Sequence, residues 1–379
     1  NASKNGTFEV DDGGTFINNG TIDMTNGGTL KFALETPDLA NYPAGTGKFK
    51  PGSGTVEYNR LSGNQTIDDT TYFNLVINGN DDTDIKRASG TTLDVNGDLT
   101  ITNGKLDMTV FNITTNPTGI STDQTYAGLT TVSAPGSGAI LSAVVVGGTV
   151  TSILVTNPGS GYSVGDALTV SQAQLTGASS DLVITLTAAN LDLEGNFSMA
   201  AGAFDAGTST THTVGGSWTD ILGSTFTPNT GKFTFESVAG NTTITTNGSF
   251  NDLSVETTGD TVSAAAVLTV DNDFTMTATN TGNFSAAAAL NVNGAFTMAT
   301  GNEGNFSTGS NTVRVTGVTD IDADTLMIST GGIFDADGDF NANGAFVTFT
   351  GDGTLKLGGN SLGTPDLGTL NDDAGLPNI

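Results

Sequence analysis

Acidic side chains offer the widest chemistry in this chain, whose 379 residues include 39 Asp and Glu, one His and no Cys. Two sets of three aspartates alternate with other residues: Asp320, Asp322 and Asp324, and Asp335, Asp337 and Asp339. Each set could place several carboxylates near one hard cation, with backbone carbonyls completing the shell. The pattern predicts calcium as a cofactor, preferably at the second set, where Gly338 permits a tight loop. A strand with an outward acidic face explains the same spacing without a metal.

Catalysis is harder to build from these residues. His212 lies in a Thr-rich stretch whose side chains alternate between two faces, and we expect it to be a solvated strand residue. Zinc sites need further His or Cys, and no Gly-x-Ser-x-Gly or Walker-type loop is present. Paired carboxylates remain a route to glycoside hydrolysis, although 39 acids form such pairs by chance. We predict that the protein is not an enzyme, with a calcium-dependent polysaccharide lyase or hydrolase as the alternative.

Charge and hydropathy exclude other partners. With 11 basic residues the formal net charge is −28, so a phosphate backbone or an anionic membrane surface would be repelled, and we expect no nucleic-acid binding. Self-repulsion of this charge also favours bound calcium. No apolar run approaches the ~18 residues of a membrane span. The start at Asn1, without Met or a signal peptide, suggests a processed or excerpted chain.

Repeats run through the chain at two scales. A unit of seven residues recurs at Val95–Ile101, Leu193–Met199, Val270–Met276 and Val292–Met298. A longer stretch from Gly54 matches one from Gly231 without a gap, at the constant offset 231 − 54 = 177. Apolar residues alternate within both copies, as in Phe233 and Phe235, which is the period of a strand with one buried face.

These repeats predict an all-β fold, a parallel β-helix (solenoid). Strands this short cannot bury a core singly, so successive coils must stack and pair their backbones. Asn-Gly pairs such as Asn96-Gly97 and Asn293-Gly294 are expected at sharp corners, because both residues tolerate a left-handed backbone. Asn-Gly also favours hairpins, so stacked β-sandwich modules are the alternative.

One strand-rich segment lacks the repeat and divides the chain. We expect N-terminal coils over 1–117, an inserted small antiparallel β domain over 118–190, and C-terminal coils over 191–379. Insertions on scaffolds often carry binding contacts. For the alternative of a carbohydrate-binding surface protein, Tyr162 in this insertion is the best aromatic candidate.

The repeats resemble those of large secreted surface proteins of Bacteroidota, such as gliding-type adhesins. The likeness rests on Gly54–Asn59, Gln65–Ile67, Tyr72–Leu75, Leu93–Ile101 and Phe204–Gly207 running into Thr211–Trp218. It implies a repetitive β-helical stalk outside the cell, at the cell surface. It also implies O-linked glycan on Asp-Thr motifs, here at Thr70, Thr261 and Thr325. The C-terminus shows no recognisable sorting domain of that secretion route.

The predicted function is therefore structural: an extracellular adhesin stalk, or a subunit of a cell-surface filament. The open ends of a solenoid carry unpaired backbone groups, which must be capped or paired with another chain. Asn1–Phe8 and Gly363–Ile379 could be caps or strands donated to a neighbour. We expect head-to-tail self-association into fibres, and surface glycans as possible ligands.

Overall fold

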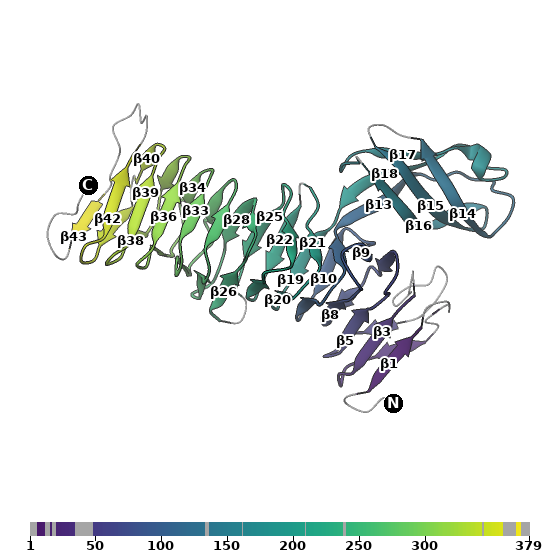
Figure 1. Cartoon of the computed structure of the whole chain (residues 1–379), viewed down its shortest axis with the longest axis horizontal. Coiled ribbons are helices and arrows are strands. Elements are labelled where there is room, and N and C mark those ends of the chain that lie inside the picture. Colours follow the sequence, from purple (N-terminus) through teal and green to yellow (C-terminus); the bar gives the residue numbers. More distant parts are fainter. Residues whose placement is uncertain are drawn as a thin grey trace. The chain divides into compact units, whose positions relative to one another are not determined.

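The computed structural model describes residues 6–11, 16, 20–34, 48–132, 136–160, 162–208, 210–237, 240–342, 345–358 and 369–372. It is an all-β parallel β-solenoid of about 15 turns, with an inserted six-stranded antiparallel sheet (Figure 1). Two compact units are distinguished. Unit 1 comprises Asn1–Val95, Thr100–Asn190 and Gly202–Thr210, and unit 2 comprises Asn96–Leu99, Leu191–Ala201 and Thr211–Ile379.

Unit 1 contains the first coils of the solenoid. One sheet runs in the order β1 (Thr7–Val10), β3 (Thr29–Phe32), β5 (Thr55–Tyr58), β8 (Asn74–Ile77) and β11 (Leu99–Ile101). A second contains β6 (Gln65–Ile67), β9 (Ile85–Ala88), β12 (Lys105–Asp107) and β21 (Ala203–Asp205). Two further pairs are β2 (Thr21–Asp23) with β4 (Lys48–Lys50), and β7 (Thr71–Tyr72) with β10 (Thr92–Val95).

Unit 2 stacks its coils into three sheets, coloured from teal to yellow in Figure 1. Its first sheet contains β20 (Phe197–Met199), β23 (Trp218–Asp220), β26 (Thr242–Thr245), β29 (Thr261–Ala264), β32 (Asn283–Ser285), β35 (Phe306–Ser307), β38 (Thr325–Ile328), β41 (Phe346–Phe349) and β43 (Thr369–Asp372). Its second sheet contains β27 (Ser249–Phe250), β30 (Leu268–Val270), β33 (Leu290–Val292), β36 (Thr312–Val315), β39 (Ile333–Ala336) and β42 (Thr354–Leu357).

The third sheet of unit 2 completes each coil. It contains β19 (Asn190–Leu193), β22 (Thr211–Val214), β25 (Lys232–Phe235), β28 (Asp252–Val255), β31 (Phe274–Met276), β34 (Phe296–Met298), β37 (Thr319–Ile321) and β40 (Phe340–Asn341). Unit 2 also contains the short strand β24 (Thr225–Thr227). Pairing within the three sheets is parallel, which confirms the predicted solenoid and excludes stacked β-sandwich modules.

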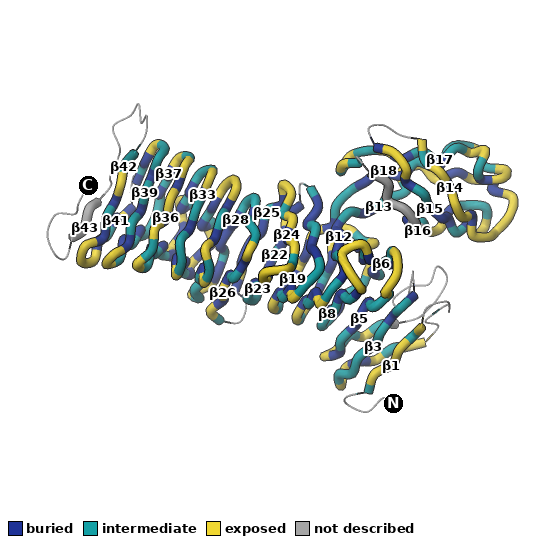
Figure 2. The backbone as a smooth tube through the Cα atoms, viewed as in Figure 1, coloured by how far each residue is buried: buried dark blue, intermediate teal, exposed yellow. Residues whose placement is uncertain are grey.

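The core forms because alternate residues of each strand point inward and stack on the same position of the next coil. The rings of Phe274 and Phe296 stack with centroids 5.2 Å apart and planes at 6°, and those of Phe284 and Phe306 lie 5.4 Å apart at 11°. All four side chains are fully buried. Figure 2 shows buried residues recurring along the coils of unit 2. Such aromatic pairs contribute about 0.5–1.5 kcal/mol beyond the area that they bury.

Glycines at one corner let successive coils approach closely. A Cβ on Gly338 would collide with the carbonyl of Gly317, and one on Gly317 would collide with that of Gly294. The left-handed backbone predicted for Asn-Gly corners occurs at Gly27 and Gly104, where φ is 85° and 84°, but it is wrong for Gly79, Gly97, Gly248 and Gly294. At Gly294 the glycine is needed because the backbone of the coil beneath leaves no room for a side chain.

The inserted sheet belongs to unit 1 and has its own core. In order it contains β13 (Thr109–Thr115), β18 (Leu182–Ala188), β17 (Ala167–Val170), β14 (Thr125–Val132), β15 (Ser137–Val146) and β16 (Thr149–Ser160), with a short helix η1 (Gln172–Gln174). The amide of Asn116 bonds both N and O of Val150, at 3.1 and 2.6 Å, so the end of β13 approaches the opposite edge strand β16. Met108 O accepts from Ala189 N at 2.7 Å, so the chain enters and leaves the insertion at one place. No helix in the described ranges is long and apolar enough to cross a bilayer.

Candidate functional site

The second predicted calcium set is engaged in ion pairs. Register aligns Arg314 on β36, Asp335 on β39 and Lys356 on β42, so charges alternate along the second sheet. Arg314 donates from Nη2 and Nε to Oδ2 of Asp337 at 2.7 and 2.9 Å. Lys356 Nζ lies 4.0 Å from Oδ2 of Asp335. These two carboxylates therefore have basic partners on opposite neighbouring coils.

The other features of this set follow from coil stacking. Asp339 is exposed, and its carbonyl accepts from Thr319 N at 2.8 Å. Gly338, expected to permit a tight loop, is required because the carbonyl of Gly317 leaves no space for a Cβ. The close approach of the coils thus explains a glycine here without a metal.

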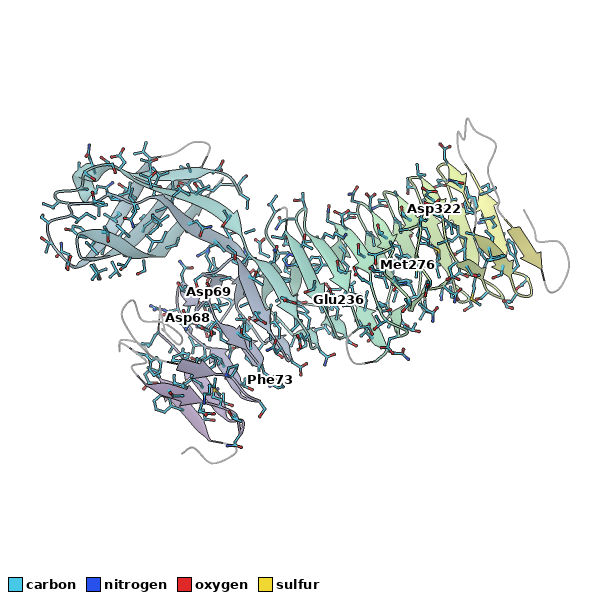
Figure 3. The ribbon with its side chains drawn as sticks, turned by 180° about the vertical axis from the view of Figure 1, so that it is seen from behind. Asp68, Asp69, Phe73, Glu236, Met276 and Asp322 are labelled. Carbon is cyan, nitrogen blue, oxygen red and sulfur yellow. The ribbon has the colours of Figure 1, made fainter. Side chains whose placement is uncertain are left out.

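The first predicted set is partly buried. Asp320 Oδ1 accepts from Nδ2 of Asn341 at 2.9 Å, and burial, together with the negative charge of Asp322, raises the pKa of Asp320. Asp322, labelled in Figure 3, accepts from Thr300 Oγ1 at 3.2 Å. Asp324 has a left-handed backbone, with φ 60°. Its carbonyl accepts from Phe346 N on the next coil at 2.8 Å. In the described part of the chain no three His, Cys, Asp or Glu are grouped to hold a metal, and calcium stays a prediction.

A second acidic group in unit 2 surrounds Glu236, also labelled in Figure 3. Burial raises the pKa of Glu236, and the charges of Asp192, Glu256 and Glu194 raise it further. Glu256 Oε1 accepts from Thr279 Oγ1 at 2.7 Å, and Asp192 Oδ1 accepts from Thr213 Oγ1 at 2.7 Å. Two of these acids are thus held by threonines of neighbouring coils.

His212 is buried, and its predicted exposure to solvent is wrong. Its side chain is 0% exposed, and Nδ1 accepts from Leu191 N at 2.9 Å. The ring stacks on Phe233 of the next coil, with centroids 4.5 Å apart. His212 alternates with Thr211 and Thr213 and so shares the inward face with Val214. The alternation was visible in the sequence, but the expectation placed the histidine on the wrong face.

Unit 1 contains a buried lysine that no sequence pattern indicated. Lys86 on β9 is 0% exposed, and its Nζ donates to the carbonyls of Arg60 at 2.7 Å and Asp84 at 3.5 Å. Burial lowers the pKa of Lys86 to about 8, although the charge of Asp84 opposes the shift. The carboxylate of Asp84 accepts from the N–H groups of Gly63 and Asn80, at 2.9 and 2.7 Å, and orders the surrounding loops.

Charged residues also mark the base of the insertion. Arg87 Nη2 lies 3.1 Å from Oδ2 of Asp107, and both side chains are almost fully buried. The guanidinium carbon of Arg87 lies 5.8 Å from the ring centroid of Phe111 on β13. Lys105 Nζ lies 2.7 Å from Oδ2 of Asp205 on the next coil. The contact of Arg87 with Phe111 thus ties the first strand of the insertion to the coil that carries it, and the two ion pairs join neighbouring coils.

Tyr162, the candidate carbohydrate contact, is partly buried. Its ring packs against the core of the inserted sheet and covers Gly136. Its hydroxyl lies 3.4 Å from Thr131 Oγ1. Binding of glycans by Tyr162 stays a prediction.

The three predicted glycosylation sites are all half-buried. Thr261 and Thr325 are the first residues of β29 and β38, and Thr70 lies in the turn before β7. Thr261 N donates to Oδ1 of Asn241 at 2.9 Å, and Thr70 N donates to the carbonyl of Asp68 at 3.0 Å. Attached glycan on these threonines stays a prediction.

Comparison with protein-family models, curated proteins and solved structures finds no match to this chain. Most of the two predicted end segments, 1–8 and 363–379, lies outside the described residues. Within the described residues, the carboxylates of Asp320, Asp322 and Asp337 bond neighbouring coils, and that of Asp335 lies near Lys356. Asp324 and Asp339 bond neighbouring coils through their main-chain carbonyls. The evidence on function is therefore the solenoid fold and the contacts between polar side chains of successive coils.

Proposed function

We propose that the chain is a non-enzymatic structural protein of the cell exterior, the stalk of an adhesin or a subunit of a surface filament. The observation that carries this proposal is the pairing of charged side chains between successive coils. Arg314 bonds Asp337 on the next coil, and Asp335 pairs with Lys356 on the coil after that. These groups stabilise the stack itself, which is what a scaffold requires of its surface.

Assembly through the ends of the solenoid is part of this proposal. Among the described residues, β1 pairs with β3 alone, and β43 pairs with β41 alone. Each strand therefore has one edge that no other described strand covers, and its backbone groups would pair with a further strand. If the uncovered edge of β43 in one copy pairs with that of β1 in a second copy, the contact joins two different surfaces and is heterologous. Repetition of this contact builds a fibre.

Calcium and surface glycans belong to the same proposal. A net charge of −28 destabilises a compact fold, and calcium in the extracellular fluid would lower that repulsion. We expect a chelator to lower the unfolding temperature of protein prepared with calcium. The measurement is a thermal melt with calcium, with magnesium, and with chelator. Identical melting temperatures in all three would remove calcium from the proposal.

Electron microscopy tests the structural role. Purified protein is imaged over a wide range of concentrations, and we expect fibres or end-to-end chains at the highest concentrations. Isolated particles at every concentration would exclude the filament subunit and leave the stalk. Release of product from pectin or alginate, abolished by Asp337→Asn or Asp320→Asn, would replace the structural role by a polysaccharide-degrading one.

A further inference from the structure

Six neighbouring strands on one face of unit 2 carry no charge, and Asp260 and Asp324 lie just outside them, directly before β29 and β38. The strands β26, β29, β32, β35, β38 and β41 of the first sheet contain no Asp, Glu, Lys or Arg. Continuous parallel register aligns one outward residue from each of them, and these six residues form the central row of what we call the uncharged face: Thr243, Ser263, Ser285, Ser307, Met327 and Thr348. Beside this row the face contains Thr261 opposite Asn283, and Thr325 opposite Phe346.

The other two sheets of the same coils are charged. The second sheet contains Arg314, Asp335 and Lys356. The third sheet contains Lys232, Asp252 and Asp320. Two copies of a chain with net charge −28 repel one another, and the repulsion is least where neither surface carries charge.

The uncharged face is accessible. Thr243 is exposed, Ser263, Ser285 and Ser307 are half-buried, and the ring of Phe346 is 45% exposed. In Figure 2, β26 and β41 alternate between buried and uncovered residues. Side chains this short let a second sheet come close to the backbone, as in the packed interfaces of small polar residues between stacked sheets.

We propose that the uncharged face binds the same face of a second copy of this chain, side by side. Successive strands of any sheet are about 4.8 Å apart, so the strand spacing of two copies is the same across all six strands of the face. The central row of each copy, five hydroxyl side chains and Met327, would then fit between the coils of the other. This contact does not use the ends of the solenoid, so it does not depend on head-to-tail assembly.

The size of the face predicts a weak contact. The six strands contain two to four residues each. At about 3.3 Å per residue and about 4.8 Å between strands, they outline roughly 300 Å². A standard interface buries about 800 Å² on each partner, so we expect dissociation constants no tighter than about 10 µM for isolated copies. When copies are held in line, several such contacts act together and the pairing strengthens.

Sedimentation equilibrium of the full chain tests the proposal. We expect reversible dimers at high protein concentration. Ser285→Asp, in the middle of the uncharged face, should weaken the association constant at least about tenfold, because an unpaired charge would be buried in the contact. Thr275→Asp makes the same change of charge on β31 of the third sheet and should leave association close to that of the unchanged chain.

A second variant protects the test against a change in folding. The chain has no Cys, so Ser285→Cys places a single thiol on the uncharged face. We expect a short bismaleimide to couple two copies of Ser285→Cys far faster than two copies of Thr275→Cys. A monomer at all concentrations, equal weakening by both aspartates, or equal coupling of both thiols would each overturn the proposal. Fibres formed end to end would persist in Ser285→Asp, so failure of lateral pairing is distinguishable from failure of the filament.

Discussion

Nε1 of Trp218 donates a 2.7 Å hydrogen bond to Oδ2 of Asp220, and both residues are buried in unit 2. Oδ1 of the same carboxylate accepts from Asn247 N at 2.9 Å. The indole stacks on Phe197, with centroids 3.8 Å apart. A single acidic side chain therefore satisfies two donors inside an aromatic part of the core.

Replacement of Asp220 by alanine should destabilise unit 2 by about 2 kcal/mol, because the buried N–H of Trp218 and the part-buried N–H of Asn247 lose their acceptor. Asp220→Asn keeps one carbonyl acceptor and should cost less. The measurement is denaturant unfolding followed by Trp218 fluorescence, since Trp218 is the only tryptophan. Equal stability of Asp220→Ala and the unchanged chain would contradict the burial of this pair.

Lys86 should make stability rise with pH. Its pKa is about 8 in the folded chain and 10.5 ordinarily, so between these values the unfolded chain binds more protons and unfolding becomes less favourable as pH rises. Below pH 8 both states are charged and the full cost of burial is present. Lys86→Met should therefore stabilise the protein by about 1–3 kcal/mol at pH 7.

The check for Lys86 is the difference in unfolding free energy between the two proteins at pH 7, 8, 9 and 10. We expect the advantage of Lys86→Met to shrink along this series. Burial also raises the pKa of Tyr58 and Tyr72, so their contribution is lost above pH 10 as the unfolded tyrosines ionise. A constant difference from pH 7 to 10 would mean that Lys86 is not buried as described.

Thr319 should be replaceable with a gain in stability. It is fully buried, its register places it between Phe296 and Phe340, and its Oγ1 has no hydrogen-bond partner. Thr319→Val keeps the shape and removes the unpaired hydroxyl, so we expect about 1 kcal/mol of stabilisation. Thr297→Val, on an outward position of β34, is the matched control and should change little. Loss of stability in Thr319→Val, measured by thermal melting, would show that its hydroxyl is bonded.

Gly338→Ala should destabilise the C-terminal coils by about 1–3 kcal/mol, because the added methyl meets the carbonyl of Gly317 and the coils must move apart. Gly20→Ala is the control, since nothing lies within 4 Å of its new Cβ. Both are compared by thermal unfolding. A neutral Gly338→Ala would mean that the stack tolerates wider spacing at this corner.

The inserted sheet should be removable. Met108 O and Ala189 N are 2.7 Å apart, so Thr109–Ala188 can be replaced by an Asn-Gly turn without moving either end. We expect the shortened solenoid to unfold cooperatively, and the excised segment to fold alone around its own buried Leu141, Leu168 and Ile184. Circular dichroism and amide exchange of both pieces check this. If the shortened solenoid were unfolded, the solenoid would depend on the contact between Arg87 and Phe111 for its stability.

Local pattern was enough to predict the fold of this protein. The alternation of residues such as Phe274 and Met276 fixes which side chains face inward in a strand, and strands of three or four residues bury a core only when coils stack. The same alternation puts His212 on the face of the apolar Val214, opposite Thr211 and Thr213, so the pattern already indicated the buried face and the prediction of a solvated histidine did not follow it.

Only the tertiary structure decided which residues meet. Arg314 and Asp337 are 23 residues apart, and their ion pair exists because the intervening coil has the length that brings them side by side. Coils differ in length, so the sequence alone does not say which acid stands beside which base, or that Lys86 lies inside. The reason is physical: the alternation of a strand is set by its own backbone, whereas its neighbours are set by the register of separate coils.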